Sequence, residues 1–261
     1  MKREYVYTDE LNDDFGGTVK RIKPLPAKYR YIRRNPLFRL FSCLIYRLVA
    51  RPLAFCYVKI RFGQRFVNKK ALRGLKGGYF LFANHVTLVG DACMPQLLSL
   101  GRRNYVITGE QTSSLTPLLG LLNALGNIPL AESASGRVQM LRCVKKRIAE
   151  GASVTVYPEK HVWPYYTDIR PYHEECFHYA VMTKAPIVAM TTCFQKRRLL
   201  KTPRILSVIE GPFYPSKELA RRDAAKELRD RVYEAMKASA ARYSTYAAYE
   251  YKKKEDVHDA S

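Results

Sequence analysis

A histidine and an aspartate stand close together after a short apolar segment. The segment is Tyr79–Ala83, and after it come His85 and, six positions later, Asp91. A short apolar run is typical of a buried strand, and the pattern of residues 91–100 predicts a helix. We therefore expect both side chains at the carboxyl end of a strand, the edge where open α/β sheets display reactive groups.

A carboxylate beside an imidazole has a clear chemical use. Asp91 can hold one ring nitrogen of His85 protonated, which leaves the other nitrogen free to take a proton from a hydroxyl group. The pair is then a candidate general base with its orienting partner. A capping or core hydrogen bond between the same residues is the alternative that the sequence leaves open.

A second apolar segment also ends in polar residues. Ser153–Tyr157 predicts a strand, and Pro158, Glu159, Lys160 and His161 follow it directly. A further carboxylate and a cation therefore stand at the end of a strand. Their position favours the catalytic interpretation of the histidine and aspartate pair.

The rest of the chain alternates between strand and helix patterns. Further strands are predicted at 105–108, 186–192 and 205–209, and further helices at 117–125, 136–150, 174–184 and, with Ser216 as N-cap, 217–243. This alternation predicts an α/β fold with a mixed, largely parallel sheet covered by helices. We expect the charged end of the chain, 249–261, to be frayed.

The chain is strongly basic, and the excess is concentrated near its start. Lys and Arg number 45 against 23 Asp and Glu, a formal net charge of +22. Between Phe15 and Gly90 there are 17 Lys or Arg and no acidic residue. Such a surface attracts anionic membranes or nucleic acid, and basic and aromatic residues alternate at 28–34. No RNA-recognition, KH or zinc-finger motif accompanies them, so we expect no nucleic-acid partner.

An apolar stretch inside this basic region predicts amphipathic helices. Residues 36–59 are apolar but interrupted by arginines, and the uncharged runs are shorter than the roughly 18 residues that a spanning helix needs. Proline at 52 is expected to end or kink the segment, giving two short helices in series. At 100° per residue the apolar residues share one face and the arginines flank it. The face includes Leu40, Phe41 and Leu44, with Arg47 on the flank.

This pattern is typical of a helix lying in the membrane interface, with apolar side chains in the acyl region and arginines at anionic head groups. The alternative is that the apolar face packs on the protein core. The basic residues around the stretch favour the membrane interpretation, with the protein bound peripherally at a membrane surface.

Several other classes find no support in the sequence. The six cysteines lie far apart and form no CxxC pair, which argues against a zinc ribbon, a redox motif or a compact disulfide framework, and we expect reduced thiols in a cytosolic setting. The acidic start of the chain lacks the features of a secretory signal. The run His173–His178 contains metal-ligand types without a complete site, so we expect no metal. Nucleophile-elbow and phosphate-loop motifs are absent.

Four sequence blocks, in order, resemble the glycerolipid acyltransferase family, the 1-acyl-glycerol-3-phosphate acyltransferases and their relatives. They are Asn84–Asp91, Leu115–Gly120 leading to Gly126–Leu130, Tyr157–Glu159, and Ala185–Val188. The amphipathic N-terminal region is similar to the two-helix membrane anchor of bacterial members. The resemblance divides the chain into a basic arm with membrane-surface helices (1–75), an acyltransferase domain (76–245) and a charged tail (246–261).

The resemblance implies transfer of a fatty acyl group from acyl-carrier protein or acyl-CoA to a lysophospholipid hydroxyl, by default that of 1-acyl-glycerol-3-phosphate. His85 would be the general base, oriented by Asp91, and the hydroxyl oxygen would attack the thioester directly. Pro158 and Glu159 would help to arrange the acceptor. The thioester is already activated, so no cofactor is implied. The protein would act at the cytoplasmic face of the cell membrane.

The chain departs from the family pattern at three places. The family has four residues between its histidine and aspartate, whereas five separate His85 from Asp91, and a bulge at Gly90 could absorb the extra one. The second block lacks the family's arginine, for which Arg137 is either a substitute or a solvated helix residue. Lys160 replaces a glycine and is either a phosphate contact or a solvated loop lysine.

These departures leave the acceptor open among lysophosphatidate, glycerol 3-phosphate, another lysophospholipid and an unusual polar lipid. They also leave a second class of function open. In it the protein is a catalytically lapsed or non-enzymatic basic module that binds anionic membrane or nucleic acid.

Overall fold

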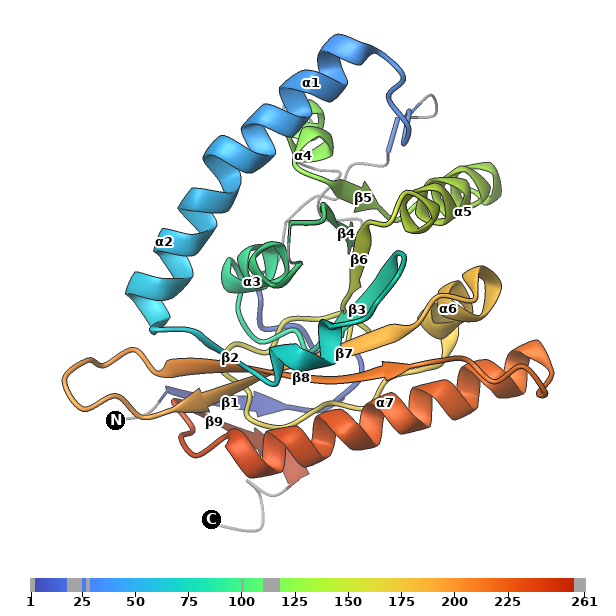
Figure 1. The fold of residues 1–261 in the computed structure, drawn as a ribbon. Coiled ribbons are helices and arrows are strands. Elements are labelled where there is room, and N and C mark those ends of the chain that lie inside the picture. Colours follow the sequence, from blue (N-terminus) through green and yellow to red (C-terminus); the bar gives the residue numbers. More distant parts are fainter. Residues whose placement is uncertain (1–2, 18–24, 27–28, 100, 110–117, 256–261) are drawn as a thin grey trace.

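A seven-stranded sheet forms the centre of the molecule (Figure 1). The computed structural model describes residues 3–17, 25–26, 29–99, 101–109 and 118–255. The strand order is β2-β8-β7-β3-β6-β4-β5, and every neighbouring pair is parallel except the antiparallel β7 and β8. The strands are β2 (Arg65–Val67), β3 (Tyr79–Ala83), β4 (Asn104–Thr108), β5 (Asn127–Pro129), β6 (Ser153–Val156), β7 (Ile187–Gln195) and β8 (Arg204–Phe213). The predicted fold class, a mixed and largely parallel sheet covered by helices, is confirmed.

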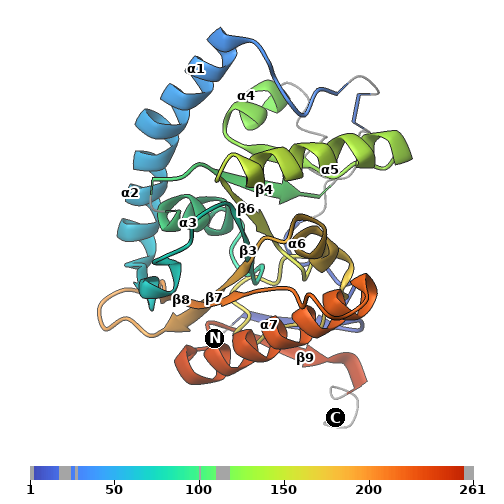
Figure 2. The same ribbon diagram turned by 45° about the vertical axis from the view of Figure 1, so that its right-hand side comes forward.

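Helices cover both faces of the sheet (Figures 1 and 2). Their bounds are α1 (Pro36–Leu44), η1 (Ile45–Ala50), α2 (Arg51–Phe62), η2 (Lys69–Leu72), α3 (Gly90–Leu98), α4 (Leu119–Ala124), α5 (Ala134–Ala149), η5 (Glu175–Phe177), α6 (His178–Thr183) and α7 (Arg221–Tyr243). Successive side chains of a strand point to opposite faces. Phe80 and Phe82 of β3 accordingly join the core under α5, α6 and α7, whereas Leu81 joins the core under α2 and α3.

The predicted elements agree with the structure apart from their ends. Strand 79–83 has the predicted bounds, and the helix predicted at 174–184 is divided into η5 and α6. Residues 100 and 115–117 of the predicted segments lie outside the described residues. The N-cap expected at Ser216 is wrong, because α7 begins at Arg221 after Ala220. The Ser216 hydroxyl instead accepts the Glu218 N–H at 3.3 Å in a local turn.

The N-terminal helices form one continuous helix from Pro36 to Phe62, so the predicted break at Pro52 is wrong. The segment η1 is π-helical, and the Arg51 N–H bonds to the Tyr46 carbonyl five residues back. Pro52 therefore lies in the first turn after a widened helical turn, where its missing N–H removes no regular α-helical bond. The helix ends at Gly63, whose φ of 55° provides the left-handed cap.

This continuous helix has the length and apolar composition needed to cross a membrane, contrary to the expectation drawn from its arginines. Core helices of soluble proteins can have the same length and composition, but they are mostly buried, whereas the apolar window of this helix is 22% buried. Its inner face packs on α3 and α4, and its outer apolar face is exposed, with Leu40 58%, Phe41 50% and Leu44 48% accessible. The apolar face therefore does not pack on the protein core.

The two ends of the chain meet in a second, two-stranded sheet of β1 (Arg3–Tyr7) and β9 (Tyr249–Lys253). The expectation of a frayed end is wrong for residues 249–253, and residues 256–261 lie outside the described part. Aromatic packing holds the pair together, because Tyr5 stacks on Tyr251 and Tyr251 stacks on Trp163. The start of the chain is thereby held against the loop that follows β6.

Candidate active site

The structure brings His85 and Asp91 together at the carboxyl end of β3. His85 Nδ1 lies 2.7 Å from Asp91 Oδ2. The histidine side chain is 21% exposed and the aspartate side chain 2%. Since a carboxylate only accepts hydrogen bonds, Nδ1 carries the proton in this pair and Nε2 has a free lone pair. The arrangement can accept a proton from a hydroxyl group.

The loop between the two residues closes around the carboxylate. Asp91 Oδ2 accepts the Thr87 N–H at 2.9 Å, and Oδ1 accepts the Thr87 hydroxyl at 2.6 Å. Gly90 begins α3, and a Cβ there would lie 2.5 Å from Thr87 Oγ1. The tight turn therefore needs glycine, and it accommodates a five-residue spacing without separating the pair.

Tyr157 supports the histidine ring from one side. Its ring stacks on His85 with centroids 4.5 Å apart and planes 26° apart, and its hydroxyl donates to the Asp91 backbone carbonyl. Burial raises the pKa of Tyr157 well above its usual value, so the hydroxyl stays protonated and remains a donor. This residue ends the second predicted strand, but sequence reasoning gave it no role.

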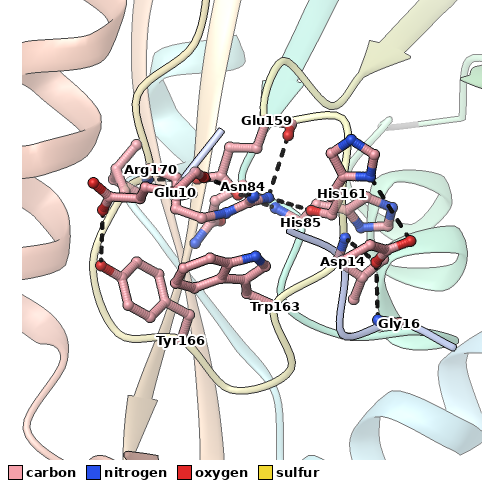
Figure 3. Close-up of polar contacts among 12 residues, drawn as sticks. Glu10, Asp14, Gly16, Asn84, His85, Glu159, His161, Trp163, Tyr166 and Arg170 are labelled. Carbon is pink, nitrogen blue, oxygen red and sulfur yellow. Dashed lines mark hydrogen bonds and ion pairs between the residues drawn. The ribbon is translucent and has the colours of Figure 1, made fainter. Parts of the chain in front are cut away.

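Glu159 lies buried behind the histidine and holds its backbone (Figure 3). Its Oε2 accepts the His85 N–H at 3.0 Å, and its Oε1 accepts the Arg170 N–H at 3.1 Å. The Arg170 guanidinium, fully buried, lies 3.5 Å from Oε2 and 4.9 Å from the Trp163 ring. Burial raises the pKa of Glu159, against the opposing effects of Arg170 and the backbone N–H groups.

Two further contacts fix the backbone around the site. The Asn84 side chain exchanges hydrogen bonds with the backbone of Thr192 on β7, at 2.8 and 3.2 Å. The Trp163 N–H donates to the His85 carbonyl at 3.1 Å, and the Trp163 indole donates to the Asp13 carbonyl at 2.7 Å. The N-terminal segment and the loop after β6 therefore support the histidine from behind.

The other sequence-predicted residues lie around this centre without contacting the pair. Pro158 is buried beside Glu159. Lys160 is 60% exposed and forms an ion pair with Glu175 at 3.3 Å. Arg137 lies in the first turn of α5, where it donates to the Glu132 carbonyl at 2.6 Å. Helix α5 follows β5, which is three strands away from β3 in the sheet, so its first turn lies about 14 Å from the end of β3 along the same sheet edge.

Two apolar residues were missed by sequence reasoning. Leu88 and Val89, in the loop between the histidine and the aspartate, are 58% and 53% exposed. The sequence signal that could have found them is two consecutive apolar residues in the loop between the histidine and the aspartate. Within the described ranges no three His, Cys, Asp or Glu side chains come together in a group that could hold a metal ion.

Comparison with known proteins gives matches among solved structures. No family model matches the chain, and no curated protein matches its sequence. Among solved structures, the chain is similar to the 1-acyl-sn-glycerophosphate (LPA) acyltransferase PlsC from Thermotoga maritima, with a TM-score of 0.54 and 16% sequence identity. The match covers 83% of this chain and 87% of the other. At this identity the likeness shows that the chain has an acyltransferase fold.

Proposed function

We propose that the protein is an O-acyltransferase that moves a fatty acyl group from a thioester to a lysophospholipid hydroxyl, with 1-acyl-glycerol-3-phosphate as the expected acceptor. The observation that supports this most is the 2.7 Å contact between His85 Nδ1 and Asp91 Oδ2, with Nε2 available, on an acyltransferase fold. Acyl-carrier protein or acyl-CoA is the proposed donor. The thioester needs no cofactor for activation.

The proposed reaction is a direct transfer. The acceptor hydroxyl donates to His85 Nε2, its proton moves to that nitrogen, and its oxygen attacks the thioester carbonyl. The tetrahedral intermediate collapses with cleavage of the carbon–sulfur bond, and the thiolate takes the proton from the imidazolium. Asp91 stabilises the imidazolium, and Glu159 with Arg170 keeps the histidine backbone in place. General base catalysis of this kind contributes about 10²- to 10⁴-fold.

We propose that this chemistry takes place at a membrane surface, and the exposed apolar residues support this part of the proposal. Leu40, Phe41 and Leu44 of α1 would enter the acyl region while Arg47 meets anionic head groups. Leu88 and Val89 would contact the same bilayer beside His85, which lets a lipid hydroxyl reach the imidazole without leaving the membrane. The cytoplasmic face is the proposed location, because both proposed acyl donors are soluble there.

The test is an acyl-transfer assay with the purified protein. Radiolabelled acyl-CoA and acyl-carrier protein are each offered with lysophosphatidate, glycerol 3-phosphate and neutral lysophospholipids in vesicles. We expect a labelled ester of lysophosphatidate. If none of the acceptors is labelled from either donor, the enzymatic proposal fails and a basic membrane-binding module remains.

A further inference from the structure

A cavity of about 580 Å³ lies between the N-terminal helix and the sheet, away from His85. Helix α1 forms one wall, and the starts of β4 and β6 with the end of α5 form the other. Its most conspicuous feature is its charge. The arginines among its lining residues are Arg33, Arg39, Arg47, Arg102, Arg103 and Arg147.

The cavity is separate from the proposed catalytic centre because it opens at the other edge of the sheet. Ala152 lines it directly before β6, whereas Tyr157 and Glu159 follow the same strand. A four-residue strand such as β6 is about 13 Å long, so the two places lie at opposite ends of the strand, separated by its length. An acceptor bound at His85 does not account for these arginines.

The described residues that line the cavity leave most of its positive charge without a counter-ion. Glu150 is the one carboxylate among them, and it is already paired with Arg147 at 2.8 Å and Lys146 at 3.0 Å. Arg39 and Arg47 make no side-chain hydrogen bond or ion pair with any residue in the described ranges. Planar guanidinium groups match the oxygens of a phosphate, so the cavity is suited to an anionic phosphate group.

Two of the arginines are held in place before any ligand binds. Arg103 donates to the Ser42 hydroxyl at 2.6 Å, and its guanidinium lies 5.1 Å from the Tyr105 ring centroid. Arg147 lies 4.7 Å from the same ring. A phosphate would therefore meet guanidinium groups that are already held in place.

The helix that forms the outer wall also indicates what carries the phosphate. Pro36, Phe38 and Leu40 line the cavity beside the arginines. At 100° per residue, Arg39, Cys43 and Arg47 form a stripe that borders the exposed stripe of Leu37, Leu40 and Leu44. An amphiphile fits this surface, with acyl chains along the apolar stripe and the phosphate among the arginines.

We propose that this arginine-lined cavity binds the phosphate of an anionic membrane phospholipid, as a second lipid site distinct from the catalytic centre. The site holds the protein on anionic bilayers and sets the orientation of the helix from Pro36 to Phe62 at the interface. Because it concerns binding alone, it does not depend on the proposed acyl transfer.

The test compares matched glutamine variants in vesicle sedimentation. Arg147→Gln removes a largely buried cation at the cavity, with a side chain 16% exposed, and Arg39→Gln removes an exposed cation that has no ion pair or hydrogen bond with any described residue. Arg142→Gln is the control, because it makes the same change on the exposed side of α5 outside the cavity. Vesicles of phosphatidylcholine carry either phosphatidylglycerol or, at equal surface charge, oleate, which is anionic and has no phosphate.

We expect the wild-type protein to prefer phosphatidylglycerol to oleate, and each cavity variant to lose about five-fold in affinity for phosphatidylglycerol vesicles. The control should keep wild-type affinity. Inorganic phosphate added as a competitor should leave the protein on the vesicles. Equal losses in all three variants, or no preference for phosphatidylglycerol, would overturn the proposal. Release by low concentrations of inorganic phosphate would make this a free-phosphate site and would also overturn it.

Discussion

Replacing Asp91 by Asn tests how the carboxylate acts on the histidine. The amide can place its oxygen toward His85 Nδ1 and its NH₂ toward the Thr87 hydroxyl, so the hydrogen bonds at 2.7 and 2.6 Å are retained in number. The charge is lost. With the charge centres about 4 Å apart and an effective dielectric constant near 20, the imidazolium loses up to about 4 kcal/mol of stabilisation.

We therefore expect kcat of Asp91→Asn to fall by about 10²- to 10³-fold with little change in KM, because proton transfer to His85 forms the imidazolium. The assay is the initial rate of labelled ester formation at saturating donor and acceptor. Urea unfolding should show a loss of about 1–2 kcal/mol, since charged hydrogen bonds at a side chain 2% exposed become neutral.

Asp230→Asn is the matched control for this prediction. It makes the same chemical change on α7, where the side chain is 53% exposed beside Arg229, and it should leave kcat unchanged. A folded Asp91→Asn protein that retains more than about a tenth of the wild-type turnover would refute the electrostatic role of the carboxylate.

Three further predictions concern the membrane face, the turn and the buried acid. Replacing Leu40, Phe41 and Leu44 of α1, each about half exposed, by serine should weaken binding to anionic vesicles by about 100-fold. Unchanged sedimentation with the vesicles would reject the assignment of this face to the membrane. Gly90→Ala should lower the free energy of unfolding and reduce turnover, because the new Cβ would lie 2.5 Å from the Thr87 hydroxyl oxygen. Wild-type behaviour in urea unfolding and in the transfer assay would contradict the conclusion that the turn needs glycine. Burial raises the pKa of Glu159 above its ordinary 4.5, so the folded state holds this proton more tightly than the unfolded state does. The free energy of unfolding should therefore fall as pH rises from about 4.5 through the folded pKa, and Glu159→Gln should lack that fall in urea unfolding. Identical pH profiles for the variant and the wild-type protein would argue against this role of Glu159.

The contact between His85 and Asp91 could be predicted from the sequence because its geometry depends on local interactions. Strand β3 has the predicted bounds, and the loop from His85 to Asp91 closes through hydrogen bonds within seven residues. The apolar run, the turn glycine and the carboxylate all act over this short range. The same holds for the five predicted strands of the sheet, which have clear apolar patterns, but β2 and β5, each three residues long, were not predicted.

The support behind the pair could not be predicted, because it depends on residues far apart in the chain. Arg170 is a single arginine in a loop, yet it is fully buried, pairs with Glu159 and donates to the Glu10 carbonyl 160 positions away. The pairing of β1 with β9 joins the two ends of the chain. Neither has a local sequence signal, because each follows from where the folded chain brings its segments.

For the N-terminal helix, the exposed apolar face was predicted from the sequence, whereas the predicted break at Pro52 is wrong. The apolar stripe follows from the 100° spacing, and Leu40 and Leu44 are exposed as the membrane interpretation expects. The continuity past Pro52 depends on the π-helical turn before it, in which the Arg51 N–H reaches Tyr46. Propensity favours a break at proline, and the widened turn removes the reason for one.

The most direct test of the central claim is kcat for His85→Ala beside the wild-type protein, at saturating donor and acceptor. The account predicts a fall of about 10²- to 10⁴-fold, because no other group replaces Nε2 as the base, together with unchanged sedimentation with anionic vesicles. Equal turnover by the two proteins would contradict the claim that this imidazole activates the acceptor hydroxyl.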